Sequence, residues 1–301
     1  MKRADYTVPP DARLRLKDHD PAATGEFSAE AEAAQKLRDA RAQLARLQDV
    51  LMANETYALL VIFQAMDGSA KDGTIREVFS AIDPQGCRAA QFEHPSEEEL
   101  RHDYLWRFRR ELPRRGHIGI FNRSYYEEVL STRVHPERLA EQRLPSYVRA
   151  GSKLWRQRFE QIDDFERHLV ENGTVVLKFF LHLSEGKQRE RLLERTAEPE
   201  KHWKFSPEDI AERAHWDEYM RAYEDALSHT STAHAPWHVV PADHRWFSAL
   251  AIADAVVRTL RSLKLSYPQP SAAERKEMDA AKRRLEAEGQ PTGTKRRSSA
   301  A

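Results

Sequence analysis

The apolar positions of the chain form two kinds of pattern, a helical spacing and short continuous runs. Between residues 28 and 54 they recur at helical spacing, which predicts a long amphipathic helix. Short apolar runs rich in β-branched and aromatic residues predict buried strands at 56–64, 87–92, 117–122, 174–183 and 237–242. Helical patterns lie between these runs, after Lys71 and at 96–112, 124–134, 144–171, 185–195, from Ser206 onward and at 246–263. Strands that alternate with helices indicate an α/β fold with a doubly wound parallel sheet.

The two ends of the chain differ from its middle. Residues 1–27 are polar and rich in Pro and Asp, which predicts an extended N-terminal arm. Residues 28–265 carry the alternating pattern and form the main predicted domain. From residue 266 to 301 the composition is polar and biased, which is typical of a solvated helix followed by a disordered basic end.

Composition and charge narrow the classes of function. The chain has 301 residues, of which 40% are hydrophobic, and this supports a folded core. Its 48 Lys and Arg residues balance 48 Asp and Glu residues, so we expect no binding to nucleic acid by overall charge, and any anionic partner must be met locally. The single cysteine, Cys87, excludes an internal disulfide framework. No apolar run reaches the ~18–20 residues of a membrane helix, and no secretion signal is seen, so we expect a cytoplasmic protein without a membrane partner.

The first candidate site follows the first predicted strand. In a parallel sheet, ligands bind beyond the carboxyl ends of the strands, and phosphate is bound there by small residues, a lysine and a helix N-terminus. The segment from Gln64 to Thr74 offers such residues: Asp67, Gly68, Ser69, Lys71, Asp72, Gly73 and Thr74. The pattern GxxxxGK[ST] is not met, because Ala65 and Ala70 replace its glycines. An ordinary polar turn before a helix is an equal alternative on this segment alone.

Two further segments place charge near predicted strand and helix ends. Residues 119–137 bring together an amide, two cations and two acids, namely Asn122, Arg123, Glu127, Glu128 and Arg133. An exposed helix face of mixed charge has the same composition. A polar connection between two helices is surrounded by five cations, Arg189, Arg191, Arg195, Lys201 and Lys204. A mobile lid over phosphates, at about residues 195–215, would need such charges, and a solvated loop would also carry them.

The order of these segments resembles the polyphosphate kinase 2 family, and specifically its subgroup that acts on AMP and ADP. The resemblance runs from about Arg13 to Leu263 through RLRLKDHDPAATGEF, QAMDGSAKDGTI, DPQG, IGIFNRSYYEEVL, HWKFSPEDIAERAHWDEYMRAYEDAL and APWHVVPADHRWF. It implies a P-loop kinase-like fold with a helical lid. It also implies transfer of the terminal phosphate of inorganic polyphosphate to AMP or ADP, which yields ADP or ATP, with Mg²⁺ and in a homodimer or homotetramer.

The resemblance also implies roles for single residues. Asp67 matches an acid that holds the metal, and Lys71 matches a lysine on the transferred phosphate. Asn122 and Arg123 match the second motif, and Glu127 matches a position linked to nucleotide choice. The remaining matches are to phosphate-binding positions, in the first turn and helix start (Gly68, Ser69, Ala70, Asp72, Gly73 and Thr74), on the phosphate channel (Arg133) and in the lid (Arg195 and Lys204).

One position departs from the family pattern D-x-x-G-K-x-G, because Ala70 stands before Lys71 where a glycine is usual. If this position needs a left-handed backbone, the alanine costs on the order of 1 to 2 kcal/mol. We hypothesise that Gly68 relaxes the turn and that activity survives. Two alternatives remain open: an ATP-dependent nucleoside monophosphate kinase on the same fold, and an inactive P-loop scaffold protein.

Overall fold

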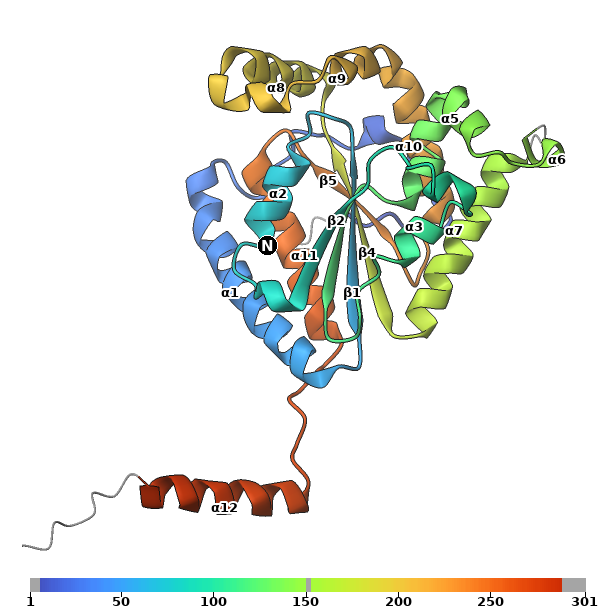
Figure 1. The fold of residues 1–301 in the computed structure, drawn as a ribbon. Coiled ribbons are helices and arrows are strands. Elements are labelled where there is room, and N and C mark those ends of the chain that lie inside the picture. The colour runs from blue at the N-terminus through green and yellow to red at the C-terminus, as the bar shows by residue number, and fades with distance from the viewer. Residues whose placement is uncertain (1–5, 150–152, 289–301) are drawn as a thin grey trace, which may run out of the picture. The chain divides into compact units, whose positions relative to one another are not determined.

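A parallel sheet of five strands organises the larger part of the computed structural model, which describes residues 6–149 and 153–288. The strand order is β2-β3-β1-β4-β5 (Figure 1). The strands are β1 (Ala58–Ala65), β2 (Cys87–Gln91), β3 (Ile118–Asn122), β4 (Thr174–His182) and β5 (Trp237–Pro241). Every residue of β1 is buried, as expected for a central strand covered on both faces. The predicted parallel α/β sheet is thus confirmed.

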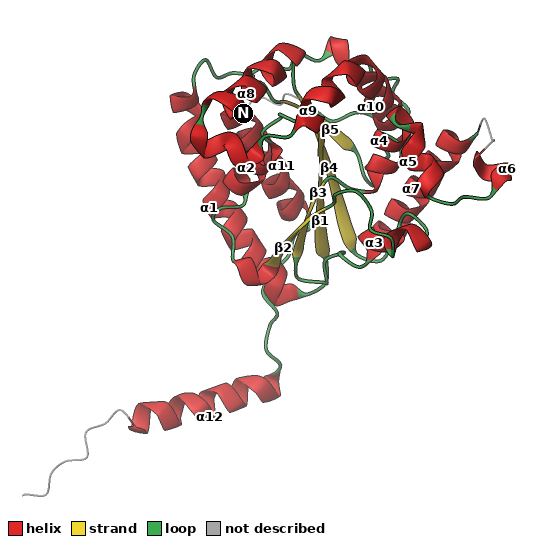
Figure 2. Cartoon of the chain, turned by 45° about the horizontal axis from the view of Figure 1, so that its top comes forward, coloured by secondary structure: helices red, strands yellow, loops and turns green. Residues whose placement is uncertain are grey.

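Helices cover both faces of the sheet (Figures 1 and 2). The long helix α1 (Glu30–Asn54), α2 (Lys71–Val78) and α11 (Arg245–Ser262) pack with one face into a single apolar core. On the other face, α3 (Trp106–Arg109), α7 (Leu154–Glu171) and α10 (Trp216–Thr230) pack into a second core. The predicted stripe of α1 is buried at Leu37, Leu44 and Leu51.

One longer helix and several short ones lie outside the two helical layers that cover the sheet. The helices α8 (Glu185–Ala197) and α9 (Pro207–Glu212) lie beyond one end of the sheet (Figure 1). The short helices α4 (Ser131–Val134), α5 (Pro136–Glu141) and α6 (Ser146–Arg149) follow β3. Residues 6–8 pair with β5, since the Val8 amide donates to the Trp237 carbonyl at 2.8 Å and the Val239 amide donates to the Tyr6 carbonyl at 2.8 Å.

Three predicted helices are shorter than expected. Ser96 and Glu99 do form the reciprocal bonds of a helix cap, but only the 3-10 turn Glu99–Arg101 follows. The Asp103 side chain accepts from the Leu105 amide at 3.0 Å and starts a new turn, so 96–112 is not one helix. Residues 124–134 form the 3-10 turn η4 (Tyr125–Glu128) and then α4. The stretch 144–171 likewise divides into α6 and α7, and residues 150–152 between them lie outside the described part.

The contacts of the chain divide it into two units, Met1–Ser266 and Tyr267–Ala301. The described part of the second unit is dominated by α12 (Ala272–Glu288), and all residues of this helix are exposed. Among the described residues, no helix combines the length and the apolar character needed to cross a bilayer.

Candidate active site

The turn between β1 and α2 is shaped by two left-handed residues. Gly68 has φ 81° and Ala70 has φ 62°, so the backbone at position 70 does adopt the conformation that favours glycine. A Cβ at Gly68 would lie 3.0 Å from the Gln188 Cγ, so any other residue there would have to push this side chain aside as well as adopt a left-handed backbone. Ala70 precedes α2, and no side chain caps the first amides of this helix. Those amides are therefore available to an anion at the carboxyl edge of the sheet.

The helix α8 holds this turn from one side. The buried Gln188 donates through Nε2 to the Asp67 carbonyl at 2.7 Å. Arg191 donates through Nη1 to the Ser69 carbonyl at 2.8 Å, and through Nη2 to the Ala242 and Asp243 carbonyls, at 2.9 Å each. The turn after β1 is therefore joined to α8 and to the end of β5 by side-chain bonds to its carbonyl groups.

An ion pair lies at the mouth of the turn. Arg123 Nη2 lies 2.5 Å from Asp67 Oδ1, and each side chain is about a third exposed. Arg123 also has a left-handed backbone, with φ 63°. Burial raises the pKa of Asp67, but Arg123 and Lys71 outweigh it and leave that pKa lowered. Burial lowers the pKa of Arg123, but Glu127 and Asp67 outweigh it and leave that pKa raised. Both groups are therefore charged at neutral pH.

Lys71 is a buried cation beside this pair. Burial, followed by the charge of Arg123, lowers its pKa to about 8, although Asp67, Glu127 and Asp72 oppose the shift. No group within the described residues forms a hydrogen bond to the Lys71 Nζ, and this ammonium is not sealed from solvent. An ammonium with three unused donors in a partly desolvated position is prepared to bind an anion.

The ends of β1 and β3 are tied together by polar side chains. Asn122 Nδ2 donates to Asp72 Oδ1 at 2.8 Å, which links the end of β3 to the first turn of α2. Gln64 Nε2 donates to Glu127 Oε1 at 2.9 Å, and the Ser124 hydroxyl donates to Gln64 Oε1 at 3.2 Å. Glu127 thus lies in the same electrostatic environment as Lys71 and Arg123 and raises the pKa of both.

Charged groups of residues 195–215, the predicted lid, act on the turn after β1 and on the helix α8 that holds it. Arg195 Nη1 lies 2.5 Å from Asp209 Oδ2 of α9, and the charge of Arg195 also lowers the pKa of Asp67. Burial, and then the charge of Asp67, raise the pKa of Asp209. Arg213 donates to Gln188 Oε1 at 2.5 Å, so the lid segment reaches the side chain that holds the turn. The side chain of Lys204 lies outside the described residues.

The structure brings most of the predicted site residues together. One cluster contains the turn after β1, the start of α2 and residues at or just after the end of β3, namely Asp67, Gly68, Ser69, Ala70, Lys71, Asp72, Asn122, Arg123 and Glu127. Gly73 and Thr74 lie in the first turns of α2. Arg133 instead pairs with Asp225 of α10 at 2.7 Å and forms no ion pair with Asp67 or Glu127. Its predicted place on a phosphate channel rests on the resemblance alone.

Three side chains that help to hold the candidate active site were not predicted from the sequence. Gln64 lies wholly buried in β1, and its signal was a polar residue at the end of an apolar run. The sequence around Gln188 and Arg213 gives no such signal. Gln188 bonds to the Asp67 carbonyl and Arg213 bonds to Gln188, and both contacts join segments that are far apart in the sequence. Within residues 6–149 and 153–288, no three His, Cys, Asp or Glu side chains form a metal-binding group. A metal ion would therefore find at most two such side chains there, Asp67 being the predicted one, and oxygens of the substrate would complete its shell.

Comparison with known proteins adds to this geometry. The profile of the family Polyphosphate kinase 2 (PPK2) matches residues 27–268. An "ADP-polyphosphate phosphotransferase" of Rhodopseudomonas palustris is 51% identical over 242 residues, which cover 80% of this chain and 84% of that protein. An "AMP/ADP-polyphosphate phosphotransferase" of Meiothermus ruber is 44% identical over 272 residues, covering 90% and 97%. The crystal structure of polyphosphate kinase 2 from Arthrobacter aurescens TC1 aligns with TM-score 0.84 and 37% identity over 95% of this chain and 96% of that one.

Proposed function

The chain belongs to the polyphosphate kinase 2 family, and on this basis we propose that it transfers the terminal phosphate of inorganic polyphosphate to AMP or ADP. One observation in the site supports the proposal most. The Lys71 ammonium lies at the start of α2 beside Asp67 and Arg123, and it has no hydrogen-bond partner within the described residues. A chain of phosphates is the kind of ligand that such a cationic site needs.

The residues of the turn neutralise and orient the phosphates. Phosphoryl transfer requires in-line alignment and neutralisation of charge, and it requires little covalent chemistry from the protein. Lys71 and the open amides of α2 hold oxygens of the transferred group. Arg123 supplies a second cation whose orientation is set by Asp67 and by its left-handed backbone. Gln188 and Arg191 hold the turn in place through their bonds to its carbonyl groups while the phosphoryl group is transferred.

We assign the metal site to Asp67 and the metal to Mg²⁺. Mg²⁺ prefers one or two carboxylates and completes its shell with water and substrate phosphates, so Asp67 alone could serve as its protein ligand. When bound, the ion would supply positive charge that neutralises the phosphates. Asp67 is suited to this role because its pKa is lowered and it is ionised at neutral pH.

The lid and channel residues complete the proposal. Arg195 pairs with Asp209, and its charge lowers the pKa of Asp67, so we place it on the phosphates when the lid closes. We place Arg133 and Lys204 on the polyphosphate chain and Glu127 on the acceptor side, by resemblance. Large apolar side chains, such as Trp203 and Phe205, are exposed, and contact with a second copy of the chain would cover such surface. We therefore propose a homodimer or homotetramer. Light scattering of the purified chain would test this.

The decisive experiment is a phosphorylation assay with each component omitted in turn. Purified chain is given AMP or ADP with polyphosphate and Mg²⁺, and the products are separated by chromatography. We expect ADP and ATP only when polyphosphate and Mg²⁺ are both present. Product that forms from AMP with ATP as the only donor would instead identify a nucleoside monophosphate kinase. Bound polyphosphate without any product would identify an inactive scaffold.

A further inference from the structure

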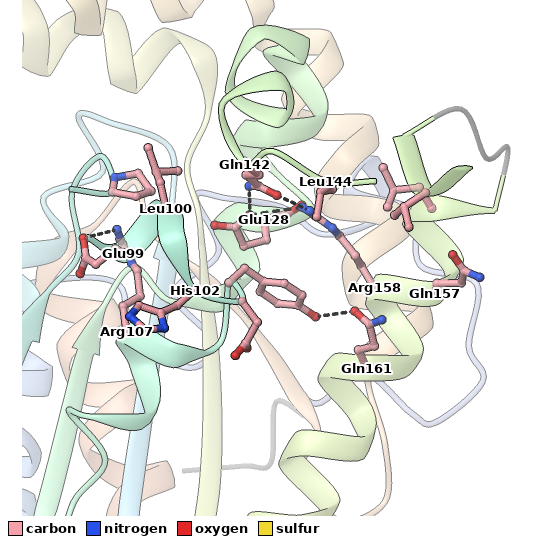
Figure 3. A pocket seen from close by; sticks show the side chains of 15 residues that line it. Glu99, Leu100, His102, Arg107, Glu128, Gln142, Leu144, Gln157, Arg158 and Gln161 are labelled. Atoms are coloured by element: carbon pink, nitrogen blue, oxygen red, sulfur yellow. Dashed lines mark hydrogen bonds and ion pairs between the residues drawn. The ribbon is translucent and has the colours of Figure 1, made fainter. Parts of the chain in front are cut away.

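The two flanks of the candidate active site are held by different parts of the chain. On the flank that follows β3, Arg158 of α7 donates to the Glu128 carbonyl at 2.7 Å, beside a cavity of about 270 Å³ (Figure 3). Residues 66–70 and α8, which the structure describes in full, do not line this cavity. The turn after β1 is held instead by Gln188 and Arg191 of α8. The groups that fix α8 therefore decide how firmly this turn is held.

The start of α8 supplies only half of a helix cap from its own sequence. Ser184 is the N-cap residue, and its hydroxyl accepts from the Lys187 amide at 3.1 Å. In a complete capping box, the side chain at the position of Lys187 accepts in return from the N-cap amide, which an ammonium cannot do. The start of α12 shows the complete box, because the Glu274 carboxylate accepts from the Ser271 amide at 2.7 Å. The N-cap amide of α8 needs an acceptor from elsewhere in the chain.

Asp243, just beyond the end of β5, supplies this acceptor from 59 residues away. Its Oδ1 accepts from the Ser184 amide at 2.8 Å, and its Oδ2 accepts from the Ser184 hydroxyl at 2.7 Å. Two bonds to one residue fix the orientation of the carboxylate as well as its distance from α8. Its negative charge also lies at the helix end where the helix dipole favours an anion. The start of α8 is therefore fixed to the end of β5.

The main chain of Asp243 is held from two further directions. Its amide donates to the Pro21 carbonyl of the N-terminal arm at 3.0 Å. Its carbonyl accepts from Arg191 Nη2 at 2.9 Å, and the same guanidinium donates through Nη1 to the Ser69 carbonyl at 2.8 Å. The N-terminal arm, the end of β5, α8 and the turn after β1 are thus connected at a single residue.

We propose that Asp243 is a positioning residue for phosphate transfer, because it fixes the start of α8 and α8 in turn fixes the turn that leads to Lys71. Gln188 lies one helical turn after Ser184, so a displaced helix start would move the amide group that holds the Asp67 carbonyl. A misplacement of about 1 Å in such a site can cost about 10²-fold in rate. The Asp243 carboxylate bonds to Ser184 and acts on the reaction only through this contact. The proposal rests on the proposed function and adds to it a residue from a distant strand.

The test compares Asp243→Ala with a control variant near the same end of β5. Ser248→Ala removes a buried hydroxyl that donates to the Pro241 carbonyl at 2.8 Å, and it leaves the bonds to α8 intact. For Asp243→Ala we expect kcat to fall about tenfold, with KM for AMP and for polyphosphate within about threefold of the parent. The Mg²⁺ concentration that gives half of the maximal rate should not change. Ser248→Ala should keep the parent kcat, although urea unfolds it at a lower concentration.

Two further variants test the route from Asp243 to the turn. Asp243→Asn keeps one oxygen for the Ser184 amide, so we expect kcat to fall only about threefold. Gln188→Met removes the bond to the Asp67 carbonyl and keeps an unbranched side chain. If Asp243 acts through α8, the loss of kcat in the chain with both Asp243→Ala and Gln188→Met should be smaller than the product of the two single losses. A loss equal to that product would show that Asp243 acts by another route.

Hydrogen exchange of the amides of residues 66–78 reports on the turn without any turnover. We expect faster exchange there in Asp243→Ala than in Ser248→Ala or the parent, with unchanged exchange in β3. Parent values of kcat and exchange in a folded Asp243→Ala chain, or a higher Mg²⁺ requirement in Asp243→Asn, would overturn the proposal while phosphate transfer by the parent stands. If circular dichroism shows that Asp243→Ala does not fold, Asp243→Asn is judged by the same two measurements. Faster exchange in the variant of a parent chain that transfers no phosphate would support the role of Asp243 in holding the turn and reject the proposed function.

Discussion

Two lysines of this protein occupy buried positions and have opposite surroundings. Lys178, in the middle of β4, is fully buried, and its Nζ contacts Glu166 Oε2 at 2.5 Å, the Tyr126 hydroxyl at 2.8 Å and the Thr230 carbonyl at 2.7 Å. Lys71, just beyond the end of β1, has no hydrogen-bond partner among the described residues. Burial lowers the pKa of both lysines.

The difference separates a structural cation from a functional one. An ammonium has three donors, and those of Lys178 are all used by the protein. The Tyr125 and Tyr126 hydroxyls also donate to Glu166, at 2.8 and 2.9 Å, so the whole cluster is satisfied. The donors of Lys71 are left for a ligand. Burial alone does not mark a functional lysine, whereas burial without partners does.

Replacement of Lys71 by methionine should have the largest effect on activity. The change removes the charge that holds the transferred phosphate and keeps the length of the side chain. By analogy with other cations on a transferred phosphoryl group, we expect a loss of about 10³-fold in turnover. The free energy of unfolding should stay constant or rise, because a desolvated charge disappears. Urea unfolding and the phosphorylation assay measure the two quantities, and retained turnover would remove Lys71 from the mechanism.

The same replacement at Lys178 should act on stability instead. It leaves the buried Glu166 carboxylate without its cation, and breaking such a pair costs about 3 to 5 kcal/mol. We expect urea unfolding to show a loss of this size. The fraction that stays folded should keep the parent KM for polyphosphate, because the Lys178 cluster does not touch the turn. A stable Lys178→Met chain with impaired turnover would contradict the division between the two lysines.

Replacement of Arg191 by methionine tests whether Lys71 needs a rigid turn after β1 to support turnover. Arg191 touches no reacting group and acts by holding the Ser69, Ala242 and Asp243 carbonyls. Each buried carbonyl that loses its donor costs about 1 to 3 kcal/mol, so the turn should loosen. We expect kcat to fall about 30-fold with a smaller change in KM. Arg191→Lys should recover part of the loss. If Arg191→Lys recovers neither kcat nor stability, the three carbonyl bonds are not the reason for the loss.

The pH dependence of kcat/KM for polyphosphate tests whether the free Lys71 ammonium binds the phosphates. Lys71 loses its proton as pH rises through about 8, so the free enzyme should lose its affinity for polyphosphate there. Because kcat/KM reports the free enzyme, this parameter for polyphosphate should fall about tenfold per pH unit above that value. In Lys71→Arg the guanidinium stays charged, and the decline should disappear even if turnover is low. A decline that persists in this variant would assign it to another group.

The sequence predicted the elements of the sheet better than the contacts of the site. The apolar runs located all five strands, and the residues around Lys71 and Arg123 were found from their positions after strands. The segment 96–112 was predicted as one helix because its pattern does not reveal that the Asp103 side chain starts a new turn. Gln188 was missed because its bond to the Asp67 carbonyl spans 121 residues. Such a partner is defined only by packing.

Position 70 gives the smallest predicted effect and the clearest test of strain in the site. Ala70 has φ 62°, where an alanine is disfavoured by about 1 kcal/mol relative to glycine, and glycine also adds freedom to the unfolded chain. These two terms oppose each other, so Ala70→Gly should change the free energy of unfolding by less than about 1 kcal/mol. Gly68 is left-handed as well, and the bonds from α8 hold the turn. We therefore expect turnover within about twofold of the parent. A large gain in turnover would show that the alanine strains the turn that holds Lys71, and that the free ammonium is not yet optimally placed.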